Sequence, residues 1–270
     1  MRRVIDGSRF SDIANAIRAK TGETGEMTPI QMVAKIEAIP ARDDTVLRGL
    51  IDRTITQISL PRDLTSIRAY TFSVCDALKL TSLPEGLTSI GDYAFQGCAQ
   101  LLLTSLPPGL TSIRQGVFQS CTLLSLTELP GGVTSIGSTA FSGCIQLALT
   151  SLPAGITSIG STAFSGCSQL ALTSLPAGIT QIEHSTFALC RNVALTELPS
   201  GVTSIGSYAF DGCTSLKQMD LPGEIKSIAN NAFIRCTNLT TINVPWAEGA
   251  VAGAPWGATN ATINYNYTWV

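Results

Sequence analysis

The chain has 270 residues, a formal net charge of −2 and only 13% charged residues. This weak charge argues against a nucleic-acid-binding surface and against attraction to an anionic membrane. No apolar run approaches the roughly 20 residues of a membrane span, and the first ten residues lack the apolar segment of a secretory signal. We therefore expect no membrane insertion. Either the chain is not exported by that route, or it lacks part of its precursor.

A repeat of 23 residues dominates the sequence. Prolines keep this interval from Pro61 to Pro245, so no insertion or deletion interrupts the array. A fixed period of this length predicts a solenoid, in which each coil buries its apolar face against its neighbours. Eight phenylalanines mark the coils, and each has a cysteine three residues later. They are Phe72, Phe95, Phe118, Phe141, Phe164, Phe187, Phe210 and Phe233.

The coil from Leu147 to Leu170 illustrates the expected local structure. A short strand is predicted over 149–152, because Pro153 lacks an N–H and ends a strand naturally. A turn and a second extended piece over 156–159 follow. The residue three before each Phe is a good helix N-cap in five of the eight coils, which predicts one helical turn carrying Phe and Cys.

Stacking should place equivalent residues of successive coils directly above one another, about 4.8 Å apart. Eight coils then give a rod or arc on the order of 40 Å long. The phenylalanines are expected to form an interior column along this rod.

The repeated pattern Leu-x-x-x-x-Leu-Pro-x-x-(Val/Ile/Leu)-Thr-Ser-Ile-x-x-x-Ala-Phe-x-x-Cys-x-x-Leu resembles the BspA-like class of bacterial leucine-rich repeats, over positions 46–245. The resemblance implies an α/β fold, a right-handed leucine-rich-repeat solenoid with short parallel strands on one face and short helical turns on the other. Six central coils depart from the family, because a leucine lies two residues after the conserved Leu instead of three. Which leucine points inward stays open. The displaced leucines are Leu80, Leu103, Leu126, Leu149, Leu172 and Leu195.

The first 45 residues carry no repeat and predict a helical hairpin. One helix begins at Ser8 or Ser11 and ends at Gly22, and a second begins at Thr28 and ends at Pro40. The segment resembles a short module of bacteriophage virion and tail proteins, which implies attachment to a larger assembly. A DNA-binding helix-turn-helix is less well supported, because the pair has few basic residues and a long connection.

Residues 246–270 leave the repeat and are expected to cap the solenoid. Ile263, Tyr265, Tyr267 and Trp269 alternate with Asn and Thr, which indicates a half-buried strand over the open edge of the last coil. The predicted domains are therefore a helical hairpin (1–45), a solenoid (46–245) and a cap strand (246–270).

No residue pattern points to catalysis, a cofactor or a bound metal. Each coil contributes one cysteine, whereas zinc sites need closely spaced pairs, so buried free thiols are favoured, although bridges between neighbouring coils are conceivable. His184 is the only histidine and occupies an outward position, apart from the interior Cys190. A nucleophile and base pair is therefore not expected, and the chain is predicted not to be an enzyme.

We predict a non-enzymatic recognition or adhesion protein, of a bacterial surface or a phage tail, that binds a protein or glycan on a cell surface. The alternative is a structural spacer or decoration protein without its own ligand, which the near-identity of the central coils favours. Ligand, origin and oligomeric state stay open. The candidate binding surface consists of residues that depart from the repeat and of aromatic residues near the C-terminus: Arg114, Glu183, His184, Arg191, Trp246, Trp256, Tyr265 and Tyr267. The C-terminal aromatic residues are also interpreted as a cap on the last coil, with some rings inward and others exposed.

Overall fold

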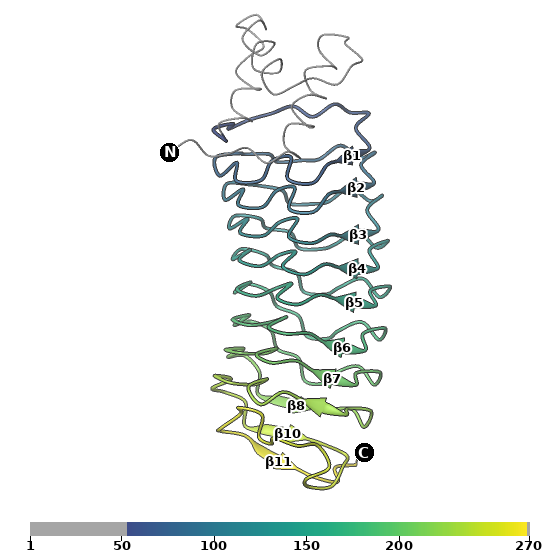
Figure 1. The fold of residues 1–270 in the computed structure, drawn as a ribbon, viewed down its shortest axis with the longest axis vertical. Helices are drawn as coiled ribbons and strands as arrows, with labels where there is room; N and C mark the ends of the chain where they lie inside the picture. Colours follow the sequence, from purple (N-terminus) through teal and green to yellow (C-terminus); the bar gives the residue numbers. More distant parts are fainter. Residues whose placement is uncertain (1–52, 269–270) are drawn as a thin grey trace, which may run out of the picture.

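The computed structural model describes residues 53–268, which stack into a rod of parallel coils (Figure 1). The predicted helical hairpin lies outside the described residues. Within them, no helix is long and apolar enough to cross a membrane. The strands are β1 (Ser66–Ile67), β2 (Ser89–Ile90), β3 (Ser112–Ile113), β4 (Ser135–Ile136), β5 (Ser158–Ile159), β6 (Gln181–Ile182), β7 (Ser204–Ile205), β8 (Gln218–Asp220), β9 (Ser227–Ile228), β10 (Thr241–Asn243) and β11 (Thr262–Asn264).

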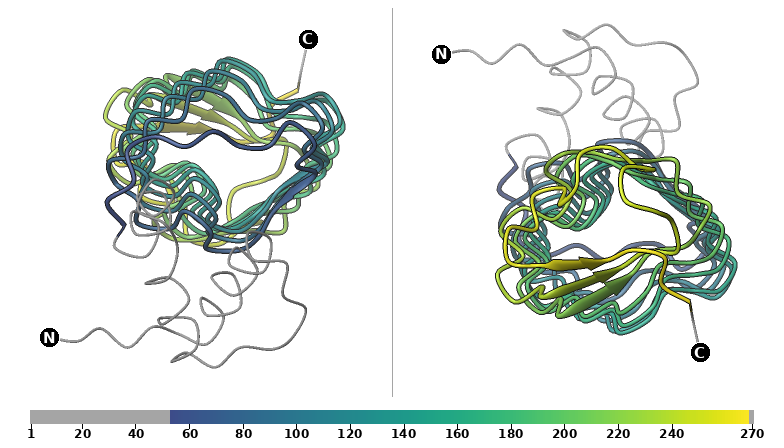
Figure 2. Two further views of the ribbon diagram at one scale, coloured as in Figure 1. Left: turned by 90° about the horizontal axis from the view of Figure 1, so that it is seen from above. Right: turned by 90° about the horizontal axis from the view of Figure 1, so that it is seen from below.

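The coils superpose closely when viewed along the rod (Figure 2). All strand pairs are parallel, and in the Ser-Ile strands each residue pairs with its equivalent 23 residues later, as Ser135 does with Ser158. In these strands the isoleucine points inward and is buried, while the preceding residue is half-buried or exposed. The two-residue alternation of a strand therefore places the apolar side chain in the core.

The strand expected over 149–152 is not formed, and the second extended piece supplies the ladder instead. Both Leu147 and Leu149 are fully buried, so both point inward. In the first piece, strands form only in two coils with the usual family spacing, and a further strand forms in the C-terminal segment. There β8, β10 and β11 pair side by side, with Met219 and Ile242 buried. In the central coils the displaced leucine is buried and no strand forms in the first piece, although residues 55–58, which keep the usual spacing, form no strand either.

The phenylalanine column is confirmed. All eight rings are at most 3% exposed. Successive rings are stacked with centroids 5.2–5.8 Å apart. The column forms a continuous apolar interior from the first coil to the last Phe, as expected for units that bury their surface only against their neighbours.

The predicted helical turn is wrong for the described residues, because the chain around each Phe makes consecutive β-turns. In one coil the N–H of Ala94 donates to the carbonyl of Gly91 (3.2 Å), and the N–H of Cys98 donates to that of Phe95 (3.1 Å). Tyr93 and Gly97 have φ of 57° and 73°. A positive φ at the third residue is the mark of a type II turn. Alternate N–H groups bond to the next coil instead of completing a helix.

All eight cysteines are free and buried, as the buried-thiol interpretation requires. In seven coils the thiol donates to the carbonyl of the Phe in the preceding coil, as Cys144 Sγ does to Phe118 at 3.0 Å. The thiols therefore add a polar link between coils to the apolar packing. Burial raises the pKa of every thiol above its ordinary value of 9.0, that of Cys236 to about 12.

These raised pKa values predict a steep loss of stability in alkali. The native thiols hold their protons at a pH where the unfolded chain releases them, so stability is fully present below about pH 9 and falls above it. Each thiol contributes a slope of up to about 1.4 kcal/mol per pH unit. Urea unfolding on both sides of pH 9 measures the effect, and Cys144→Ala should reduce the slope. A pH-independent free energy of unfolding up to pH 11 would contradict the burial of ionisable thiols.

The C-terminal end is closed by β11 and by Trp256. β11 pairs with β10 and leaves Ile263 half-buried, but it is shorter than the expected strand, because it ends at Asn264 and a turn follows at Tyr265. Asn264 donates to the side chain of Asn243, which donates to Asp220, at 2.8 and 2.7 Å. These hydrogen bonds between side chains link β8, β10 and β11 in addition to the backbone pairing.

Candidate functional site

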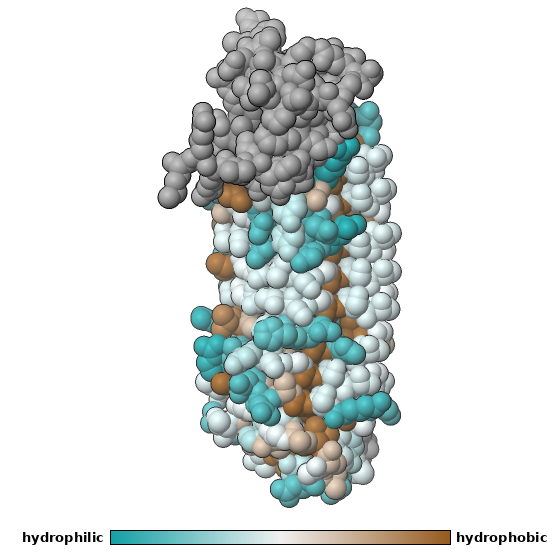
Figure 3. All heavy atoms as spheres, viewed as in Figure 1, coloured by the Kyte–Doolittle hydropathy of each residue, from teal (hydrophilic) through white to brown (hydrophobic). Residues whose placement is uncertain are grey.

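A shallow groove follows the isoleucines of β3 to β7 and of β9 along the rod. We call it the axial groove. Figure 3 displays it as a hydrophobic stripe parallel to the long axis, where Figure 1 has the strands. Its first segment runs from Arg114 to Glu183, and its second from Glu183 to Ala229. The isoleucines form the floor, and polar residues on both sides of the strands form the walls; most are serines, with Gln115 beside β3 and Gln181 in β6. The floor residues are Ile113, Ile136, Ile159, Ile182, Ile205 and Ile228.

In the two-residue strands, which end in isoleucine, the next residue lies where two coils approach closely. We call this place in the repeat the glycine position. A Cβ on Gly160 would lie 2.5 Å from the backbone nitrogen of Ser138, and one on Gly137 would lie 2.6 Å from that of Gln115. Such contacts are shorter than atoms allow, so the backbone must shift if a side chain is present. Ala229 is nevertheless accommodated, with its N–H bonded to Ile205.

Charged residues occupy the glycine position in three coils, as Arg68, Arg114 and Glu183, and the strand ladder is interrupted at Arg114 and Glu183. The N–H of Gly137, Gly160 and Gly206 donates to the isoleucine carbonyl of the preceding coil at 2.7–2.8 Å, but within residues 53–268 the N–H of neither Arg114 nor Glu183 has a backbone acceptor. The sheets end at these coils, between β2 and β3 and between β5 and β6. A charged side chain at this position therefore splits the sheet.

Arg114 and Glu183 differ in how their charge is compensated. Arg114 forms a bidentate ion pair with Asp92, in which Nε donates to Oδ1 at 2.9 Å and Nη2 donates to Oδ2 at 3.3 Å. Glu183 is half-buried and has no ion-pair partner in the described part of the chain. Between them the sequence has no charged residue from 129 to 182. The first groove segment thus has a neutral end, an uncharged middle and an anionic end.

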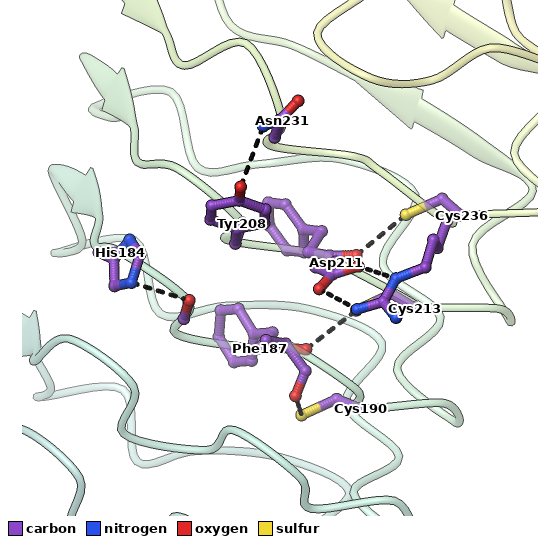
Figure 4. Close-up of polar contacts among 12 residues, drawn as sticks. His184, Phe187, Cys190, Tyr208, Asp211, Cys213, Asn231 and Cys236 are labelled. Atoms are coloured by element: carbon purple, nitrogen blue, oxygen red, sulfur yellow. Dashed lines mark hydrogen bonds and ion pairs between the residues drawn. The ribbon is translucent and has the colours of Figure 1, made fainter.

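Polar and aromatic side chains gather beside the second segment (Figure 4). The ring of His184 meets that of Tyr208 edge-on at 6.0 Å, and Asn231 donates to the Tyr208 hydroxyl at 3.2 Å. Asp211 is nearly buried and accepts from Arg235 at 2.7 Å. Near the other end of the rod, Tyr70 and Tyr93 stack with centroids 5.2 Å apart. These contacts produce two small aromatic surfaces on the turns that flank the groove.

The residues predicted from sequence are therefore only partly brought together. Arg114 and Glu183 line one groove segment, and His184 lies next to Glu183. Arg191 is exposed and lines neither segment. The remaining four are at the C-terminal end: Trp246, Trp256, Tyr265 and Tyr267.

Trp256 is a correction to the candidate surface. Its side chain is fully buried, its indole N–H donates to the Ala252 carbonyl at 2.8 Å, and its own carbonyl accepts the N–H of Phe233. The ring closes the core and is not accessible to a partner. Trp246 and Tyr265 are half-buried against the core, while Tyr267 is 36% exposed.

Sequence reasoning missed the groove serines and the glycine position. Ser135 and Ser138 recur in the repeat between the apolar positions, and nothing in the sequence pattern distinguished them as groove residues. A signal for the glycine position was nevertheless present. Gly91, Gly137, Gly160 and Gly206 share one place in the repeat, and only a close backbone approach needs glycine there.

Comparison with known proteins agrees with the fold. The family model of the BspA type leucine rich repeat region matches residues 51–171 and 135–248 in six copies. The chain belongs to this family. Among curated proteins no sequence matches this BspA-type chain.

Two solved structures resemble the BspA-type solenoid. A leucine-rich repeat protein from Bacteroides ovatus has a TM-score of 0.55 and 21% identity, over 77% of this chain and 68% of its own. The T. pallidum leucine-rich repeat protein has a TM-score of 0.50 and 27% identity, over 69% of this chain and 78% of its own. Both matches agree with the leucine-rich-repeat fold that the family model assigns to this chain.

Proposed function

We propose that this BspA-type chain is a non-enzymatic recognition protein that attaches to a protein or glycan on a cell surface. The observation that carries the proposal is the axial groove, whose first segment is bounded by two charged residues at a position that holds Gly or Ala in the other coils after the first, which has Arg68. At Arg114 and Glu183 the backbone hydrogen bonds between coils that the glycines form are absent. Local structure that costs stability is concentrated at functional sites, and this supports a binding role for the groove.

The direct test is a binding screen with the full chain. Labelled protein is incubated with bacterial cells, with host cells and with arrays of surface glycans and proteins. We expect saturable binding to at least one of them, reduced by Arg114→Glu together with Glu183→Lys. The charge-swapped pair Lys226→Glu and Glu224→Lys, at exposed positions outside the groove, serves as control. Saturable binding to none of the targets would reject a recognition role.

The N-terminal segment is proposed to join the solenoid to a larger assembly, which for a phage protein would be the tail. Deletion of residues 1–45 should leave a solenoid with unchanged far-UV circular dichroism and melting temperature, since the described coils bury their core against each other. The shortened chain should no longer enter its assembly in co-purification. Global unfolding of the shortened chain would contradict this division of roles.

A structural spacer without a ligand is the second candidate. The coils of β4 and β5 favour it, because they carry the same residues at the strand and at the glycine position, and a specific site usually needs differences between coils. The binding screen separates the two candidates, because a spacer joins its assembly but binds no cell-surface target.

A further inference from the structure

We infer that the first segment of the axial groove binds a linear, neutral β-1,4-linked glycan, which runs parallel to the rod with about one hexose on each coil. The inference rests on the proposed recognition function and adds to it the site and the class of ligand. The segment is the stretch from the Asp92 and Arg114 pair to Glu183, over β3, β4 and β5.

The spacing of the groove favours a glycan over an extended peptide. Arg114 and Glu183 are three coils apart, which is about 14 Å at 4.8 Å per coil. A peptide strand advances about 3.3 Å per residue, so its side chains would lose register with the coils within a few residues. A β-linked hexose unit in an extended chain is about as long as one coil. Each sugar can therefore meet the same set of groups as the previous one.

The groups repeated in each coil suit hydroxyl-bearing ligands. Ser135 and Ser158 on one wall and Ser138 and Ser161 on the other contribute hydroxyls that both donate and accept hydrogen bonds. Among the described residues, the backbone N–H groups of Ser138 and Ser161 donate to no protein acceptor. Backbone donors are nearly always paired, with protein, water or ligand. A sugar hydroxyl or ring oxygen at each coil would supply an acceptor.

The charges select against anionic glycans. Arg114 is already paired by Asp92, and among the described residues that line this segment no other cation is available for a carboxylate or sulfate of the ligand. Glu183, without a cationic partner in residues 53–268, adds a negative charge at the far end. A carboxylate accepts hydrogen bonds from two adjacent sugar hydroxyls, and bonds to a charged group are the stronger kind. Glu183 should therefore hold one end of a neutral chain.

The floor of the groove adds an apolar contact. Ile113, Ile136 and Ile159 are 1–4% exposed and form a narrow apolar line between the two hydroxyl walls. The C–H face of a pyranose ring can lie on this line while its hydroxyls reach the serines at both sides. The groove thus combines an apolar floor and polar edges at the spacing of a sugar chain, which is the usual composition of a specific ligand site.

The test is calorimetric titration of the full chain with β-1,4-linked glucose and mannose oligomers, from disaccharide to hexasaccharide. Affinity should rise with length up to about four units, the span of three coil spacings, and then level off. Glu183→Gln should weaken binding about tenfold, because it keeps the shape of the side chain and removes its charge. Ser135→Val with Ser158→Val should weaken it further, while Glu224→Gln leaves it unchanged. Unaltered melting temperatures show that the variants fold.

Three outcomes would overturn the inference. They are failure of every neutral oligomer to bind, binding that Glu183→Gln and the serine variants do not affect, and preference for a uronic-acid oligomer or for an extended peptide. If the labelled chain still attaches to cells while these oligomers neither bind nor compete, the glycan inference fails and the recognition function stands. If the chain attaches to no target at all, both fail.

Discussion

Replacing Phe164 with Ala should lower the free energy of unfolding by about 3–5 kcal/mol. The ring is fully buried, with the rings of Phe141 and Phe187 stacked on it at 5.5 and 5.7 Å. Backbone ladders hold the coils on both sides, since the N–H of Phe164 bonds to Thr186 and that of Phe141 to Ala163. The neighbouring coils cannot collapse into the gap, so the cavity persists. Urea unfolding followed by circular dichroism measures the loss.

The matched control is Leu123→Ala. Leu123 is 36% exposed on an outer turn, so its truncation should cost less than about 1 kcal/mol. Similar losses for the two variants would mean that the rings are not an interior column. Truncation of any other central Phe should resemble Phe164→Ala, because all of them have the same neighbours above and below.

Placing a charged side chain at the glycine position of a central coil, as in Gly160→Glu, should cost about 2–4 kcal/mol. A Cβ at Gly160 would lie 2.5 Å from the backbone of Ser138. The coils must separate locally, and the bonds from Gly160 N–H to Ile136 (2.8 Å) and from Thr157 N–H to Thr134 (3.0 Å) are then lost. We expect this variant to split the sheet of β3, β4 and β5, as Glu183 does between β5 and β6. Denaturant unfolding gives the cost.

The reverse substitution, Glu183→Gly, provides the matched comparison. It should restore two ladder bonds of about 0.5–1.5 kcal/mol each, partly offset by the backbone entropy of glycine, for a net gain of about 1 kcal/mol. If Gly160→Glu unfolded at the same urea concentration as the unaltered chain, the close approach at this position would not control the ladder.

The repeat made the interior predictable from sequence. Phe, Cys and Leu recur at fixed positions and have nowhere to be buried except against the same residues of the next coil, so the columns of Phe141 and Cys144 follow from the period alone. The alternation around Ile263 predicted a strand there, although β11 ends at Asn264, before Tyr265 and Tyr267.

The path of the backbone between these columns was less predictable. Ser and Asn before the Phe suggested a helix cap, but type II turns require positive φ at Tyr93 and Thr139, which non-glycine residues adopt only when surrounding structure imposes it. Here bonds to the next coil impose it, as from Tyr93 N–H to Gln115 (2.9 Å). A local propensity was overridden by stacking. Glycines at equivalent places, such as Gly97 and Gly143, were the available hint.

The candidate site was predictable in part. Arg114 and Glu183 stood out because they depart from the repeat, yet their shared position and its effect on the ladder required the coordinates. The site depends on a contact between coils, which one repeat viewed alone does not contain. The sequence left open whether Trp256 caps the last coil or faces a partner, since its burial depends on how the last coil closes over the core.

The measurement that tests the account most directly is residue-resolved amide hydrogen exchange of the native chain. The N–H groups of Gly137, Gly160 and Gly206 donate across coils and should exchange slowly, whereas those of Arg114 and Glu183, at the same position of the repeat, should exchange much faster. This pattern would establish a stack of coils joined at the glycine position and interrupted at the two ends of the groove. Equal protection at all five positions would contradict it.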